Sequence, residues 1–132
     1  DTSPVVQVNP DKTKTLSLRS PRQTMTALEA LLDQEDDETI WTKLLSSVTI
    51  DELKSRGYTR EQYLDWLHVN RREFAKTFAR MPLGHNTPTV ITEKPERKTW
   101  ILRISGKPAE GLAFTRVWVR LENGQWRLRW ID

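Results

Sequence analysis

The side chains best suited to chemistry lie on one face of a sheet predicted in the C-terminal third. They are Arg103, Arg116, Trp118, Arg120, Arg127 and Arg129. Guanidinium groups bind anions, and arginine interleaved with an indole suits stacking on bases or packing in a protein interface. We expect Arg120 directly opposite Arg127. Because like charges across a ladder repel, an acidic group should lie nearby: Glu122, Glu93, the acidic first helices, a partner's carboxylate or phosphate.

Outward arginines also have a purely structural use. Their long cationic side chains cover an exposed sheet, keep it soluble and resist edge pairing. The sequence therefore leaves three readings of this face open: a solvated surface, an interface with a protein or with a second copy of the chain, and a site for nucleic acid.

A second group of residues is predicted to line the space between a long helix and the sheet. Its members are Tyr63, Trp66, Asn70 and Phe74 from the helix, and Trp100, Trp126 and Trp130 from the strands. Asn70 falls in the middle of the aromatic stripe, where an unpartnered polar group costs roughly 1–3 kcal/mol. It either bonds to backbone or to a buried water, or anchors a ligand in a pocket.

Other chemistry has little support in the residues. The chain has no cysteine, and its two histidines, His68 and His85, lack clustered carboxylates. We therefore predict neither a metal site nor a disulfide. The acidic run 35–38 lacks the glycine and the spacing of a calcium loop. The sequence contains no glycine-rich phosphate loop, no nucleophile elbow and no His-Glu-x-x-His, so we expect no cofactor.

The sheet is predicted from alternating apolar residues. Asn123-Gly124 between two such runs indicates a hairpin with a type I′ turn. The expected pairs are Glu122 with Gln125, Leu121 with Trp126, Arg120 with Arg127, Val119 with Leu128, Trp118 with Arg129 and Val117 with Trp130. Earlier strands are expected over residues 99–104 and 89–93, which makes about four strands in all.

Helices are predicted ahead of the strands. Ser20-Pro21 opens the first, residues 38–46 form the second, and Thr49 begins a third that Gly57 ends. Thr59 begins the longest, over residues 60–80. Helices followed by strands indicate an α+β fold in which N-terminal helices pack on a curved antiparallel sheet.

Chain length and charge distribution indicate the domain bounds and the kind of partner. The 132 residues suffice for one domain with a hydrophobic core, which we place at residues 20–132, after a flexible tail or tether over residues 1–19. Residues 1–59 carry 7 basic and 10 acidic side chains, whereas residues 60–132 carry 14 and 8. The second half therefore favours anionic partners. No apolar run approaches the roughly 18 residues of a membrane span.

The Ser-Pro-Arg-Gln start of the first helix, the helices that follow, and the terminal Asn-Gly-Gln-Trp-Arg-Leu-Arg-Trp-Ile strand form a pattern over residues 20–132. It resembles the nuclear transport factor 2-like superfamily, the cone-shaped fold of ketosteroid isomerases and polyketide cyclases, and within it small exported or lipoprotein-type domains. The resemblance implies a cone and an extracytoplasmic location. The enzymes of that superfamily use Asp, His or Tyr residues in the pocket. Asp65 and His68 lie off the apolar stripe here, so no catalytic residue is carried over.

The favoured hypothesis is a non-catalytic binding or protein-interaction domain. It would hold a small apolar ligand in the cone, or pair through the arginine- and tryptophan-rich face with a protein partner or in a homodimer. The first alternative is an isomerase-, cyclase- or dehydratase-type enzyme that uses the cone pocket. The second is single-stranded nucleic-acid binding by the same face.

Overall fold

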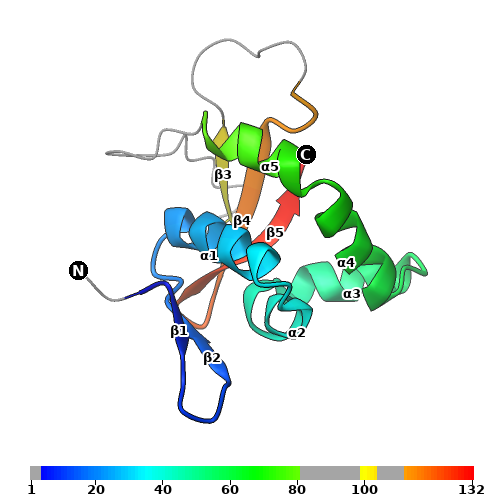
Figure 1. Ribbon diagram of the computed structural model, residues 1–132. Coiled ribbons are helices and arrows are strands. Elements are labelled where there is room, and N and C mark those ends of the chain that lie inside the picture. Colours follow the sequence, from blue (N-terminus) through cyan, green and yellow to red (C-terminus); the bar gives the residue numbers. More distant parts are fainter. Residues whose placement is uncertain (1–3, 81–98, 104–111) are drawn as a thin grey trace.

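The computed structural model describes residues 4–80, 99–103 and 112–132 of the chain (Figure 1). It confirms the predicted α+β class, with helices preceding the main sheet. The elements, in chain order, are β1 (Val6–Val8), β2 (Lys14–Leu16), α1 (Pro21–Asp33), α2 (Asp37–Thr39), the π-helix η1 (Ile40–Leu44), α3 (Ser47–Ser55), α4 (Arg60–Val69), α5 (Arg71–Phe78), β3 (Thr99–Arg103), β4 (Arg116–Glu122) and β5 (Gln125–Ile131). The strand predicted at residues 89–93, Ile104 and the His85 loop lie outside the described residues.

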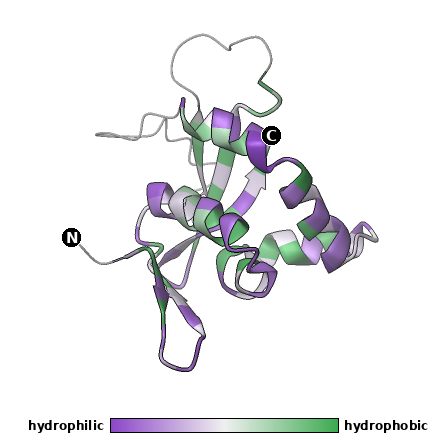
Figure 2. Ribbon diagram, viewed as in Figure 1, coloured by the Kyte–Doolittle hydropathy of each residue, from purple (hydrophilic) through white to green (hydrophobic). Residues whose placement is uncertain are grey.

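β3, β4 and β5 form an open antiparallel sheet in that spatial order. α1 lies across this sheet, and α3 contacts β5 on the side where α4 also lies (Figure 1). Hydrophobic and hydrophilic bands alternate along the helices (Figure 2). The apolar residues of α1 meet Val117, Val119, Leu128 and Ile131 of the sheet in one buried core.

The β4–β5 hairpin confirms the predicted turn. Asn123 and Gly124 have φ angles of 51° and 78°, and a type I′ turn requires positive values at both positions. The pairs nearest the turn also follow the prediction, including Arg120 directly opposite Arg127.

The predicted register is wrong beyond Val119, because β5 contains one extra residue. Trp118 pairs with Trp130 rather than with Arg129, and Val117 pairs with Ile131 rather than with Trp130. Arg129 is thus the extra residue of a β-bulge, and the residues after it exchange faces. Ile131 enters the core, where it is 2% exposed, and Trp130 joins Trp118 on the opposite face.

Contacts from distant segments hold this bulged strand in place. The Thr49 hydroxyl donates to the Arg129 carbonyl at 2.6 Å, and the Ser46 N–H donates to the Leu128 carbonyl at 2.8 Å. Nearer the turn, the Thr24 hydroxyl donates to the Trp126 carbonyl at 2.6 Å. These bonds satisfy polar groups along the edge of β5 that would otherwise be buried without partners. The bulge therefore depends on helix contacts and not on the strand's own alternation.

Two of the three predicted helix caps agree with the structure. The Ser20 side chain caps α1, and Thr59 and Gln62 form the predicted capping box of α4. The start predicted at Thr49 is wrong, because Ser46 caps α3 and Thr49 lies buried within that helix. Gly57, with φ of 81°, follows the end of α3 as predicted.

The single long helix predicted over residues 60–80 is also wrong. The chain forms α4 and α5, which meet at Asn70. The Asn70 side-chain amide donates to the Trp66 carbonyl at 2.9 Å. Asparagine competes for backbone groups in this way and favours helix ends over helix interiors. The Asn70 side chain thus follows the backbone-bonded alternative.

For residues 4–19, which the structure describes, the N-terminal segment corrects the expectation of a tether over residues 1–19. β1 and β2 pair as an antiparallel hairpin, and Leu16 and Leu18 that follow the turn are buried in the main core. The Trp126 N–H donates to the Leu18 carbonyl at 2.7 Å, which joins this segment to β5. Two apolar residues are too short a pattern for the sequence to predict this packing.

Candidate functional site

The face of the sheet opposite Val117 and Val119 carries the predicted cationic residues. We call it the Arg/Trp face and define it by Arg116, Trp118, Arg120, Arg127, Arg129 and Trp130. Trp130 is here only because of the bulge. Arg103 pairs with Arg116 in the ladder, but its side chain lies outside what the structure describes.

Carboxylates of the same chain neutralise three arginines of this face. Asp132 accepts two hydrogen bonds from Arg116, both at 2.9 Å. Glu52 of α3 pairs with Arg129, and Glu122 lies 3.6 Å from Arg120. The acidic group expected near Arg120 and Arg127 therefore includes Glu122, which was one of the candidates. Glu93, another candidate, lies outside the described residues.

Trp118 is fixed by the same network. Its indole N–H donates to Asp132 at 3.0 Å, and the Arg116 guanidinium lies 5.4 Å from the centre of its ring. This cation–π contact and the bidentate ion pair hold the indole in one orientation. A large aromatic surface held in this way loses little entropy when a partner binds.

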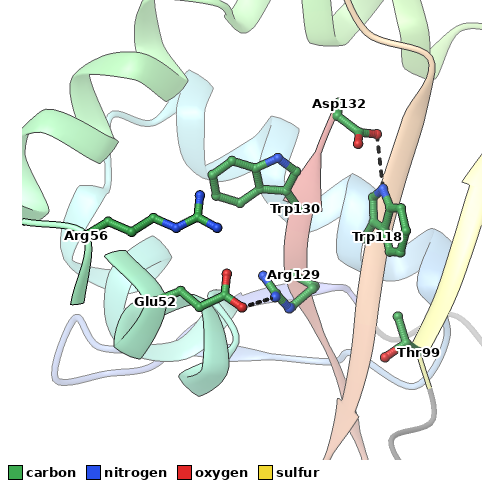
Figure 3. A pocket seen from close by; sticks show the side chains of 7 residues that line it. All are labelled: Glu52, Arg56, Thr99, Trp118, Arg129, Trp130 and Asp132. Atoms are coloured by element: carbon green, nitrogen blue, oxygen red, sulfur yellow. Dashed lines mark hydrogen bonds and ion pairs between the residues drawn. The ribbon is translucent and has the colours of Figure 1, made fainter. Parts of the chain in front are cut away.

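A hollow of about 310 Å³ opens beside Trp118 (Figure 3). We call it the polar hollow. It is lined by Glu52, Arg56, Thr99, Trp118, Arg129, Trp130 and Asp132. α3 contributes Glu52, the three strands contribute most of the rest, and Arg56 follows the end of α3. Figure 3 shows the Arg56 side chain extending toward the indole of Trp130.

A second hollow, of about 340 Å³, lies beside the first and shares Arg56 and Trp130 with it. We call it the apolar hollow. It is lined by Leu53, Arg56, Tyr58, Gln62, Tyr63, Trp66 and Trp130. Tyr58 is 54% exposed at its rim. Trp130 stacks on Trp66 with ring centroids 6.0 Å apart, so the wall between the hollows is a packed indole.

The charges around the two hollows are unevenly satisfied. Glu52 and Asp132 are each paired with an arginine. In the described part of the chain, by contrast, the exposed guanidinium of Arg56 has no hydrogen-bond or ion-pair partner. The free charge at the boundary of the hollows is therefore positive.

Two ionisable groups near the site have shifted pKa values. Burial alone would raise the pKa of Glu122, but hydrogen bonds from Ser46 and Ser47 and the charge of Arg120 outweigh burial and hold it below its ordinary value of 4.5. Burial raises the pKa of the Tyr63 phenol far above its ordinary value, although Arg129 opposes the shift. Glu122 thus stays ionised as a structural anion, and Tyr63 stays neutral.

The predicted pocket residues are brought together only in part. Tyr63, Trp66 and Trp130 line the apolar hollow. Phe74 packs against Phe114 with centroids 4.9 Å apart, and faces a different hollow between α1 and α5. Trp100 and Trp126 form their own pair nearer the hairpin turn, with centroids 5.3 Å apart. Of the seven residues, the apolar hollow thus brings together Tyr63, Trp66 and Trp130.

Sequence reasoning missed Glu52, Arg56, Thr99 and Asp132 as site residues. They come from separate segments, and only the folded chain brings them together. The one usable signal was Gly57, which ends α3 and so leaves Arg56 at the exposed end of that helix. No sequence pattern indicated that this helix end faces β5.

Within residues 4–80, 99–103 and 112–132, no three His, Cys, Asp or Glu side chains are grouped as metal ligands would be. In the same part of the chain, no helix combines the length and apolar character needed to cross a membrane.

Comparisons with protein-family models, with curated proteins and with solved structures found no match to this chain.

Proposed function

We propose that this chain is a non-catalytic binding domain that recognises a protein partner through the Arg/Trp face and its two hollows. The observation that carries the proposal is the pairing of Trp118 with Trp130 across the strands, around a hollow that is also lined by Arg56, whose side chain has no partner among the described residues. Tryptophan and arginine dominate binding energy in protein interfaces, especially where they surround a recess.

The ion pairs favour a protein over nucleic acid as the partner. Binding to a phosphate backbone depends on cations that are free to neutralise it. Arg116, Arg120 and Arg129 already have carboxylate partners within the chain. The indoles and the apolar hollow, which these ion pairs leave available, suit apolar side chains better than a polyanion.

Three finer hypotheses belong to the same proposal. The first is the nuclear transport factor 2-like cone, supported by the order of helices and strands, with the fourth strand expected at residues 89–93. The second is a small apolar ligand, for which the apolar hollow has a suitable size. The third is an extracytoplasmic location, for which the support is the resemblance to small exported domains.

The residues around which an active site was expected give the enzyme alternative little support. The Asn70 amide is bonded to a backbone carbonyl, and the Tyr63 phenol is 5% exposed with a raised pKa. Neither group is positioned to exchange a proton with a substrate near neutral pH.

Selection from a displayed random-peptide library tests the proposal. We expect enriched peptides to bind the wild-type protein and to lose at least about tenfold in affinity for Trp118→Leu, because an interface tryptophan commonly contributes that much. Trp100→Leu, in the separate pair with Trp126, is the matched control and should bind nearly as well as wild type. Circular dichroism checks that both variants are folded.

Two outcomes would count against the proposal. One is a library that yields no binder. The other is a set of binders that Trp100→Leu weakens and Trp118→Leu does not. Sedimentation over a wide concentration range distinguishes the homodimer, since a self-associating face would give a dimer that Trp118→Leu dissociates.

A further inference from the structure

The two hollows meet at Arg56 and Trp130, and their chemistry differs. The apolar hollow is lined mainly by a leucine and aromatic rings, with Gln62 and Arg56 beside them, whereas the polar hollow contains ion pairs. A partner that fills both must present an apolar group and a polar group close together. This inference rests on the proposed function and specifies the chemistry of the partner.

The sign of the polar group follows from the charges that remain free. Glu52 is bound to Arg129, and Asp132 is bound to Arg116 and to the Trp118 indole. A cation entering the polar hollow would have to compete with these bonds. An anion would instead meet Arg56, whose guanidinium is exposed and has no partner among the described residues. Charge-assisted bonds between arginine and carboxylate are among the strongest available to such a pair.

The size and lining of the apolar hollow indicate what accompanies the anion. Leu53, Trp66 and Trp130 form its wall, and its volume of about 340 Å³ accommodates one large apolar side chain. In an extended peptide, residues two positions apart project from the same side. An apolar side chain in this hollow would therefore place a carboxylate two residues away on the side of Arg56.

We propose that the partner is an extended peptide segment with a large apolar residue and an aspartate or glutamate two positions apart. The apolar side chain enters the apolar hollow beside Trp130, and the carboxylate binds the guanidinium of Arg56. Binding forms no covalent bond. It displaces water from the indole wall and forms one ion pair.

Defined peptides test this inference by NMR titration of the ¹⁵N-labelled full chain. The probe is a short, capped, glycine-based peptide with one leucine and one glutamate two positions apart. Its control has glutamine in place of the glutamate. We expect saturable shifts of the Trp130 indole resonance with both peptides, and an affinity at least about fivefold higher for the glutamate peptide, as one charge-assisted hydrogen bond provides.

Two arginine variants locate the charge. Arg56→Gln should remove the preference for glutamate while keeping the weak affinity for leucine. Arg22→Gln, an exposed arginine on α1, should keep the full preference. Equal affinity for the two peptides, retention of the preference in Arg56→Gln, or saturable binding that leaves Trp130 unshifted would each overturn the inference.

Competition with other classes of ligand separates this inference from the proposed function. Library peptides that require Trp118 but show no acidic residue near an apolar one would leave the proposed function intact and refute the peptide chemistry. A single-stranded oligonucleotide that displaces the glutamate peptide and binds more tightly would refute both. Absence of saturable shifts with either peptide at millimolar concentration would refute the inference alone.

Discussion

Replacing Thr49 by valine tests whether the bulge at Arg129 is held by α3. Thr49 is fully buried, and its hydroxyl donates to the Arg129 carbonyl at 2.6 Å. Valine keeps the shape of the side chain but leaves that buried carbonyl without its donor. An unsatisfied buried acceptor costs about 1–3 kcal/mol, so we expect the free energy of unfolding to fall by that amount.

Thermal unfolding followed by circular dichroism measures this loss. For a chain of this length, 1 kcal/mol corresponds to roughly 4 °C in Tm, so the expected decrease is about 4–12 °C. Thr26→Val is the matched control, because Thr26 is exposed on α1 and its hydroxyl donates to the Arg22 carbonyl of the same helix. That variant should remain within about 0.5 kcal/mol of wild type.

The Tm values of the two threonine variants show whether the hydrogen bond to the bulge stabilises the fold. If Thr49→Val and Thr26→Val have the same Tm as wild type, the hydrogen bond to the bulge contributes nothing, and our explanation of the register shift is wrong. A large loss in Thr49→Val alone supports it. The Trp130 environment should change in the same variant, which the indole resonance of Trp130 in the ¹⁵N-labelled protein can detect independently.

Three further predictions follow from the same contacts. The folded-state pKa of Glu122 lies below its ordinary value of 4.5, so the ionised carboxylate stabilises the fold above that value. This contribution is lost as pH falls through the folded-state pKa. The fall of stability with acid should therefore be shallower in Glu122→Gln, and an unchanged profile would contradict this. Arg127 lies opposite Arg120, and among the described residues its buried Nε has no hydrogen-bond partner. Arg127→Thr should therefore raise the free energy of unfolding by about 0.5–1 kcal/mol in urea denaturation. A loss above about 1 kcal/mol would show that the arginine is stabilising. Asn70→Ala removes the bond to the Trp66 carbonyl at the junction of α4 and α5. Loss of this one hydrogen bond should cost about 1 kcal/mol by the same assay. A gain in stability would mean that the two helices can merge into one.

Features fixed by neighbouring residues were predictable from the sequence. Asn123-Gly124 adopts positive φ angles at little cost, so the turn and the pairs beside it follow from two residues. The Ser20 and Thr59 caps likewise depend on side chains that bond to backbone groups within the same turn. These local preferences agree with the fold, and the predictions made from them are confirmed.

Features decided by distant contacts were not predictable. The bulge at Arg129 depends on Thr49 and Glu52, and strand alternation gives no sign of it. Its consequence is large, because the bulge moves Trp130 from the predicted core face to the Arg/Trp face. The break at Asn70 had a sequence signal, since asparagine disfavours helix interiors, but the aromatic periodicity on both sides of it obscured that signal.

The central claim is that Trp118 and Trp130 share a partner-binding surface while Trp100 and Trp126 do not. Titrating the ¹⁵N-labelled protein with a library-selected peptide and following the indole resonances of its six tryptophans tests this claim most directly. We expect the indoles of Trp118 and Trp130 to shift and to saturate together, with those of Trp100 and Trp126 unmoved. Saturable shifts of Trp100 and Trp126, with Trp118 and Trp130 unchanged, would contradict the account.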